Sequence, residues 1–338
     1  MATALMAKFR RTRIGSSGAF EGLRQLAGLA LIFLIAIVLS PRAHDNNSII
    51  FLSEANLTDI VRQVSENGII AIGMTFVILT GGIDLSVGSM LALASTFAAK
   101  LLMQWPTQGN WASHITVIIA ITLVLAASIG ALMGFAISKL KVQPFIITLA
   151  GMIGLRGLAR FLTDNANVDI GFGKDITAAF CNAISQKGVV MLTFALLAVV
   201  FYIILSRTVF GLQVRSVGDN PTASRYAGLP VTRTLIFTYA LCGFLVGIAG
   251  VIHAAQNHQG NPNDGVGYEL DAIAAVVIGG TNMSGGKGSI FGTIVGVFIL
   301  GVITNMFRLK GVDINVEMMC KSVIIVVAVW LQMPRTKS

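Results

Sequence analysis

Asp84 is the acidic residue most suited to a chemical role, because it adjoins apolar sequence. A charge in such a segment is costly and by default indicates function. One possibility is proton coupling, in which the carboxylate takes up and releases a proton. The other is structural: after Gly81 and Gly82, the carboxylate accepts backbone N–H groups at the start of a helix that begins near Ser86. We favour capping, since helices commonly start with Asp or Ser.

The pattern that contains Asp84 recurs near the other end of the chain. Residues 81–86 and 279–284 both read G-G-x-x-x-S, and each is followed shortly by Gly-Ser. Both interrupt apolar runs, and glycine-interrupted segments in corresponding halves indicate internal duplication and broken helices around a path through the protein. The alternative is that these glycines only allow close helix packing. The residues assigned to the path or the broken helices are Gly81, Gly82, Asp84, Ser86, Gly279, Gly280, Thr281 and Ser284.

Other reactive residue types do not form a recognisable catalytic or metal-binding arrangement. The histidines show neither metal-ligand spacing nor a Ser/His/Asp pattern, and we expect each to be a polar loop or interfacial residue. They are His44, His114, His253 and His258. The cysteines are too few and too scattered for a disulfide framework or a metal site, and are predicted to be packing residues. They are Cys181, Cys242 and Cys320.

A nucleotide-binding loop is also missing, because Gly286-Lys287 is followed by Gly288 and lacks the spaced upstream glycine. The chain should therefore not bind a nucleotide phosphate by itself. We predict no catalytic residue, no metal and no cofactor, so any energy source must lie in another subunit.

The composition indicates which elements position these residues. Of the 338 residues, 55% are hydrophobic and only 12% are charged, and the mean hydropathy is +0.81. Soluble proteins average about 45–50% apolar and about 25% charged residues, so this chain cannot cover a water-soluble surface. Its apolar runs do not alternate with polar residues, which favours helices over a transmembrane barrel. The sequence predicts an all-α, polytopic transmembrane protein.

About ten spans of suitable length can be placed along the chain. Their approximate bounds are 24–40, 60–80, 87–103, 114–138, 144–163, 188–206, 234–254, 269–280, 290–306 and 317–333. The segments 60–103 and 269–306 are interrupted by Gly-Gly and polar residues, and there we expect broken or re-entrant helices. The intervening segments 41–58 and 164–187 are richer in Asn, Asp and Ser and are predicted to lie outside, with short surface helices.

The first apolar stretch follows a basic segment and could imitate a secretory signal. The alternative is therefore a cleaved peptide. However, the sequence from Ser40 to Asp45 offers no convincing small-x-small cleavage site. We interpret Leu26 to Ser40 as a retained first helix.

The placement of Lys and Arg predicts the orientation in the membrane. The net charge of +9 suggests nucleic acid or an anionic surface, but in so apolar a chain the position of the charges matters more, because cytoplasmic loops are enriched in Lys and Arg. The basic clusters lie before the first span, at Lys139 and Lys141, from Arg207 to Arg233, and at Arg335 and Lys337. Placing all of them in the cytoplasm requires an even number of crossings and two cytoplasmic termini. The predicted divisions are a tail 1–23, a transmembrane domain 24–333 with a cytoplasmic loop 207–233, and a tail 334–338.

The loop 207–233 carries complete helix start and stop signals. Asp219-Asn220-Pro221 supplies a cap followed by proline at the first helical position. Residues 222–227 can then form about two turns, which Gly228 and Pro230 end. A plain connecting loop is the alternative. A rigid short helix on the cytoplasmic surface is what a membrane protein needs to receive force from a partner.

Several stretches together resemble the permeases of ribose-type and related monosaccharide ABC importers, over about residues 60–333. They are GMTFVILTGGIDLSVGS at 73–89, PFIITLAGM at 144–152, Arg156 with Gly157, the segment from Gly218 to Gly228, AVVIGGT at 275–281 and SGGKGS at 284–289. The first and last motifs are specific, and the middle ones are supportive.

The resemblance implies a multi-pass subunit of the bacterial inner membrane, surrounded by lipid, with no nucleic-acid partner. It implies a second permease, either an identical copy or a paralogue, two cytoplasmic ATPase subunits, and a periplasmic or extracellular sugar-binding protein. In such proteins a short cytoplasmic helix docks into the ATPase. The match assigns this coupling role to Gly218, Asp219, Asn220, Ala223, Arg225, Tyr226 and Gly228. We expect Gly218 to permit the turn that aims the helix at the ATPase. Family permeases often have glycine in place of Asp219, which weakens a specific role for its charge.

The sequence therefore predicts a permease subunit that moves a monosaccharide into the cytoplasm by alternating access, with ATP hydrolysed by partner subunits. One rival is a secondary, ion-coupled transporter that uses Asp84, which would work without ATPase partners. Another is a membrane-embedded enzyme, which should show a convergent set of polar catalytic groups. The sequence leaves open which sugar is carried.

Overall fold

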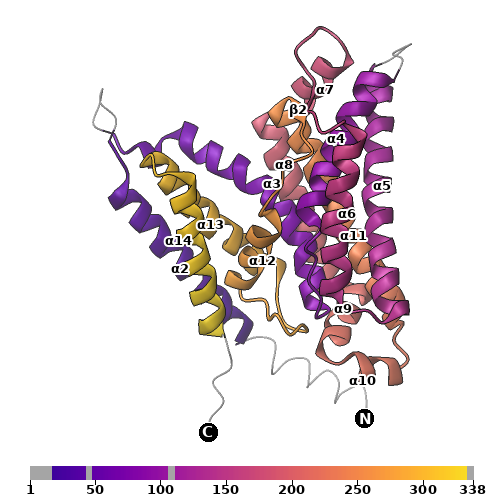
Figure 1. Ribbon diagram of the computed structural model, residues 1–338. Coiled ribbons are helices and arrows are strands. Elements are labelled where there is room, and N and C mark those ends of the chain that lie inside the picture. The colour runs from indigo at the N-terminus through magenta and orange to yellow at the C-terminus, as the bar shows by residue number, and fades with distance from the viewer. Residues whose placement is uncertain (1–16, 43–47, 106–110, 333–338) are drawn as a thin grey trace.

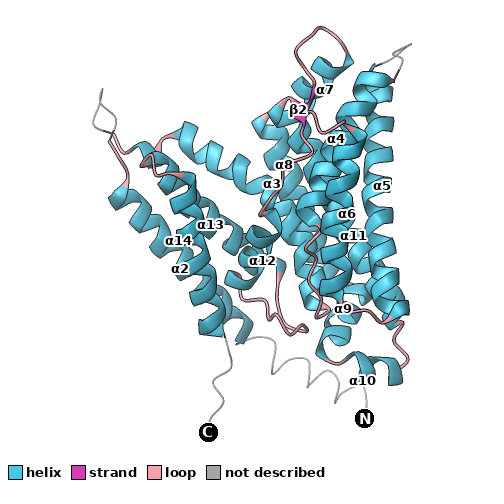
Figure 2. Ribbon diagram, in the orientation of Figure 1, coloured by secondary structure: helices cyan, strands magenta, loops and turns pink. Residues whose placement is uncertain are grey.

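The computed structural model describes residues 17–42, 48–105 and 111–332, most of which form α-helices (Figure 2). The predicted tails up to residue 16 and from residue 333, and His44, lie outside the described residues. The long helices are α2 (Ser17–Leu39), α3 (Glu54–Leu79), α4 (Val87–Gln104), α5 (Trp111–Leu140), α6 (Pro144–Leu162), α8 (Lys187–Arg207), α11 (Val231–Asn257), α13 (Ile290–Leu309) and α14 (Ile314–Gln332). The short elements are η1 (Ile50–Leu52), β1 (Val168–Asp169), α7 (Ile176–Ile184), α9 (Val209–Asp219), α10 (Pro221–Tyr226), β2 (Gln259–Gly260) and α12 (Tyr268–Ile278).

Seven of the described helices are long and apolar enough to cross a membrane, so the chain is a polytopic helical membrane protein. These segments are Gly22–Leu39, Val87–Gln104, Trp111–Leu140, Pro144–Leu162, Lys187–Arg207, Val231–Asn257 and Ile290–Leu309. Each of the ten predicted spans coincides with a helix, although the number of crossings stays a prediction. With 11 residues, α12 is about 16 Å long, roughly half of the ~30 Å hydrocarbon core, and cannot cross it alone.

One boundary differs clearly from the sequence prediction. Helix α3 begins at Glu54, six residues before the expected start, because the Ser53 hydroxyl accepts a hydrogen bond from the Asn56 backbone N–H at 3.3 Å and caps the helix. The first part of α3 is polar, and its residues are buried without interruption only from Gly68 onward. The polar first part of α3 extends the helix into the segment predicted to be an outside loop.

Helix α11 lies at the centre of the bundle, where it packs against α5, α4 and α3 (Figure 1). Small residues permit this contact. A Cβ atom added to Gly130 of α5 would lie 2.2 Å from the Tyr239 carbonyl oxygen of α11, so the two backbones approach too closely for any side chain. Helices α2, α12 and α14 lie to one side with α13 (Figure 1).

The bundle has two distinct ends, which α11 connects over about 40 Å (Figure 1). The α10 end carries α9 and α10. The β2 end carries α7 and the short antiparallel ladder in which Val168 of β1 pairs with Gly260 of β2.

Candidate functional site

The predicted short helix in the loop 207–233 is present as α10. Asn220 caps it, since its Oδ1 atom accepts a hydrogen bond from the Ala223 backbone N–H at 2.9 Å. Pro221 occupies the first turn, and Gly228, at φ +79°, adopts the left-handed conformation that follows a helix end. The Ser224 hydroxyl donates to the Ser216 carbonyl of α9 at 2.7 Å and fixes α10 on α9.

The outer surface of α10 is available to a partner. Ala223 and Arg225 are exposed, and Tyr226 has 89% of its surface exposed. Aromatic and arginine side chains are the residue types most enriched at the centres of protein interfaces. A rigid helix that presents both of them at one end of the bundle can dock against another protein.

Gly218 serves a different purpose from the one predicted, because it lies inside α9 and not in a turn. A Cβ atom at Gly218 would lie 1.8 Å from the Leu79 carbonyl oxygen and 2.6 Å from the Gly286 backbone nitrogen. The expectation that Gly218 permits a turn is therefore wrong. Its missing side chain lets α9 touch the last residue of α3.

The two glycine-containing motifs meet α9 at this point. The Gly286 backbone N–H donates to the Leu79 carbonyl at 2.9 Å, which joins the segment after α12 to the end of α3. A Cβ atom at Gly286, at φ +74°, would lie 1.9 Å from Asp219 Oδ1, and Asp219 is itself exposed. We call Leu79–Gly82, Gly218–Asp219 and Gly285–Gly286 together the glycine junction.

The repeated motifs both follow helix ends, but their backbones are offset by one residue. The left-handed glycine is Gly81, the first of its pair, after α3, and Gly280, the second of its pair, after α12. The remaining two glycines allow close contacts. A Cβ atom at Gly82 would lie 2.4 Å from the Tyr239 hydroxyl, and one at Gly279 would lie 2.3 Å from the Gly292 carbonyl oxygen. Close packing and helix breaks therefore both account for these glycines.

Asp84 accepts a hydrogen bond just before α4 but is not the N-cap of that helix, which is Ser86 and makes no side-chain capping bond. The Asp84 Oδ1 atom accepts hydrogen bonds from the Ser86 backbone N–H at 2.9 Å and from the Ser86 hydroxyl at 2.6 Å, directly before α4. Both side chains are buried. In the second motif Thr281 is buried, whereas Ser284 is exposed and its N–H donates to Asn282 Oδ1 at 3.0 Å. In both motifs the serine N–H therefore donates to Oδ1 of the residue two positions earlier, but only in the first motif are these two residues buried and joined by a second bond from the serine hydroxyl.

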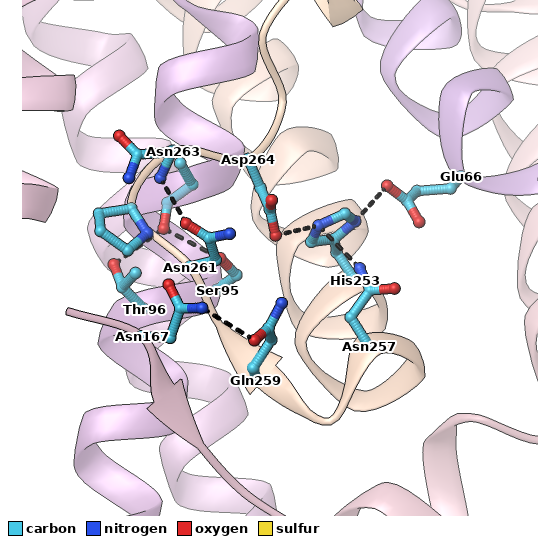
Figure 3. A network of polar contacts seen from close by, with 12 residues as sticks. Glu66, Ser95, Thr96, Asn167, His253, Asn257, Gln259, Asn261, Asn263 and Asp264 are labelled. Atoms are coloured by element: carbon cyan, nitrogen blue, oxygen red, sulfur yellow. Dashed lines mark hydrogen bonds and ion pairs between the residues drawn. The ribbon is translucent and has the colours of Figure 1, made fainter. Parts of the chain in front are cut away.

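A second polar group, in the β2 half of the bundle, was not predicted (Figure 3). His253 of α11 is buried, so the expectation that it is a loop or interfacial residue is wrong. Its Nδ1 atom lies 2.7 Å from Glu66 Oε1 of α3, and its Nε2 atom lies 2.8 Å from Asp264 Oδ2 and 2.9 Å from Asn257 Nδ2. We call Glu66, His253, Asn257 and Asp264 the polar cluster.

Two arginines of α6 bind the chain beside the polar cluster. Arg156 donates to the carbonyl of Pro262 at 2.7 Å and also to that of Asp264. Arg160 donates through Nε and Nη2 to Asn263 Oδ1, at 3.0 and 2.8 Å. The signal that could have found these residues is their charge within apolar helices. Within the ranges that the structure covers, no group of His, Cys, Asp and Glu is arranged to hold a metal ion.

Comparison with known proteins gives consistent matches over most of the chain. Residues 56–329 match the family described as branched-chain amino acid transport system / permease component. The chain is 40% identical to the ribose import permease protein RbsC of Escherichia coli (strain K12), over 91% of this chain and 92% of that protein. It is 38% identical to ribose import permease protein RbsC of Bacillus subtilis (strain 168), over 94% and 95%. It is 30% identical to the xylose transport system permease protein XylH of Escherichia coli (strain K12), over 94% and 95%. No solved structure matches the chain.

Proposed function

This chain belongs to the permease-component family of branched-chain amino acid transport systems, and on that premise we propose that it is the membrane subunit of an ABC importer that carries a monosaccharide into the cytoplasm. The resemblance to ribose-type sugar permeases is confirmed, because relatives that carry ribose or xylose in their names match over nine tenths of the chain. These two pentoses are the first substrates to test.

The proposed setting is the bacterial inner membrane, with both termini and the α10 end in the cytoplasm. Basic residues support this orientation, since they are concentrated around α9 and α10 and at the end of α5. The proposed partners are two cytoplasmic ATPase subunits at the α10 end, a second permease in the membrane, and a periplasmic or extracellular sugar-binding protein at the β2 end. ATP hydrolysis belongs to the ATPase subunits.

The glycine junction is the observation that carries the proposal. Because α10 is fixed to α9, and α9 touches both the end of α3 and the segment after α12, a displacement of α10 is passed on to both interrupted segments. Such packed contacts transmit rigid-body motion without any covalent chemistry. ATP binding in the partner would thus open the path alternately to the two sides of the membrane.

Co-purification of the ATPase with variant permeases tests the docking assignment. Ala223→Glu and Arg225→Glu should each reduce the amount of bound ATPase and sugar uptake together, because they change the exposed surface of α10 and leave the bundle core intact. Ala183→Glu is the matched control: it places the same charge on an exposed alanine of a short helix, α7, at the opposite end. Unchanged association and uptake in both α10 variants would make α10 a connecting element only.

A further inference from the structure

The chain from His258 to Gly267, which includes β2 and leads into α12, forms no helix. We call residues 258–267 the strap. The strap starts at the β2 end, and α12 then continues toward the glycine junction at the α10 end. Since α12 spans only about half of the hydrocarbon core, the strap must cover much of the other half. Irregular backbone at that depth is tolerated only where it is buried in protein or lines a water-filled path.

Polar side chains from three helices fasten the strap. Asp264 binds His253 of α11, which in turn binds Glu66 of α3, and two arginines of α6 bind the strap at Pro262, Asn263 and Asp264. Figure 3 shows the amides Asn257, Gln259, Asn261 and Asn263 gathered around the same place. A single break at His253 would therefore separate the strap from both α3 and α11.

The strap also fits closely against α4. A Cβ atom at Gly260 would lie 2.7 Å from the Thr96 Cα atom, and one at Gly265, at φ +72°, would lie 2.5 Å from the Gly88 carbonyl oxygen. No side chain stands between the strap and α4 at these two points. The polar cluster therefore holds the strap together with the two arginines of α6 and the β1–β2 ladder, and no interlocking side chain ties the strap to α4 at these two glycines.

The chemistry of the cluster matches that of a sugar. Carboxylates, an imidazole and amides supply the donors and acceptors that sugar hydroxyls bind, and here they satisfy one another. Opening would leave the buried carboxylate of Glu66 and the half-buried carboxylate of Asp264 unpaired, which is costly, unless a polar molecule takes over their hydrogen bonds. Two sequence neighbours of cluster members have unused hydrogen-bonding capacity: among the described residues, Asn67 Oδ1, next to Glu66, and Gln256 Nε2, next to Asn257, are buried without a hydrogen-bond partner.

We propose that the strap and the polar cluster are the gate that closes the translocation path toward the sugar-binding protein, and that Glu66, His253 and Asp264 exchange their mutual bonds for sugar hydroxyls when this gate opens. The inference rests on the proposed import function and deepens it. Removing one charged partner should favour the open state, and the ATPase-active conformation should then form without the binding protein.

The test uses the complete complex of permease, ATPase and binding protein in lipid vesicles. Glu66→Gln, His253→Gln and Asp264→Asn should raise ATP hydrolysis in the absence of binding protein by roughly tenfold, the change expected when one charge-assisted hydrogen bond is lost. Asn257→Ala, which removes only one bond to His253 from an exposed position, should change it less and in the same direction. Asp175→Asn is the control, because this acid is not a member of the polar cluster, its side chain bonds within the segment 175–178 before and in α7, and asparagine can replace it as the cap of α7.

A second readout addresses the contact with sugar. Uptake without binding protein is measured for D-ribose and 2-deoxy-D-ribose; the cluster variants should alter the ratio of the two rates, whereas Asp175→Asn should not.

If the variants are folded and abundant but keep the wild-type basal ATP hydrolysis and the wild-type ratio of the two uptake rates, the cluster is only a structural brace and the proposal is overturned. If the wild-type chain binds no ATPase at all, it is the import function that fails. If a buried variant does not fold, Asn257→Ala decides between gate and brace.

Discussion

At the scale of single residues, the role of Asp84 can be separated into acceptor and charge. Asp84→Asn keeps an oxygen that can accept the Ser86 N–H, so we expect this variant to retain most sugar uptake. Asp84→Leu cannot accept, and we expect less folded protein, with a loss of about 0.5–2 kcal/mol, similar to that of a missing cap. Uptake in vesicles and the midpoint of thermal unfolding measure the two effects. If folded, abundant Asp84→Asn protein were inactive, the carboxyl proton would be needed and ion coupling would replace this structural role.

Which residues could be predicted depends on the sequence distance of their partners. The Asn220–Ala223 contact lies within three residues and follows the local N-cap rule, so the sequence was sufficient. Asp84 also bonds locally, to Ser86, but from a turn before the N-cap. Glu66 and His253 are 187 residues apart, and only the packing of α3 on α11 brings them together. No spacing rule could have indicated that pair. The sequence offered only the cost of each isolated charge as a signal.

At the scale of elements, the contact of α9 with α3 makes Gly218 the most sensitive position of the proposed coupling route. Gly218→Ala places a Cβ atom against the Leu79 carbonyl, and overpacking of this kind costs about 1–3 kcal/mol. Because the docking surface of α10 is unaltered, the variant should still bind the ATPase while its uptake per ATP hydrolysed falls roughly tenfold.

The control for Gly218→Ala is Gly154→Ala. Gly154 lies inside α6, and an added Cβ atom would meet nothing within 4 Å. Uptake and hydrolysis should therefore stay at the wild-type values in this variant. Equal behaviour of the two alanine variants would show that the glycine junction does not transmit motion.

Helices were predictable where the apolar run itself determines the element. The ten predicted spans all coincide with helices for that reason, since an apolar segment in lipid must satisfy its backbone internally. Helix α9 was not predicted, because its burial comes from contacts with α3, α8 and α11 and not from its own pattern. The strap was missed as well: its non-helical path depends on Arg156 and His253, which approach it from other helices.

At the scale of the whole molecule, the same two helices contribute to both proposed functional regions. The end of α3 joins the glycine junction, whereas Glu66, earlier in α3, joins the polar cluster. Likewise, α12 connects the strap to the segment that contains Gly286. A tilt of either helix therefore changes both regions at once. Alternating access requires such a link, because one gate must close as the other opens.

The orientation of the bundle decides whether these assignments are correct, and single exposed cysteines can measure it. Tyr226 on α10 and Phe172 before α7 are 89% and 80% exposed and lie at opposite ends. In intact cells, an impermeant thiol reagent added outside should label Phe172→Cys and not Tyr226→Cys, and opened membranes should expose Tyr226→Cys.

In the background protein for this experiment, Cys242 and Cys320 are replaced. Cys181 can stay as an internal control: burial, with a smaller effect of Asp175, raises the pKa of its thiol to about 11, so almost none of the reactive thiolate forms near pH 7. Labelling of Tyr226→Cys from outside would place α10 on the wrong side of the membrane for an ATPase and would reverse the roles of the two ends.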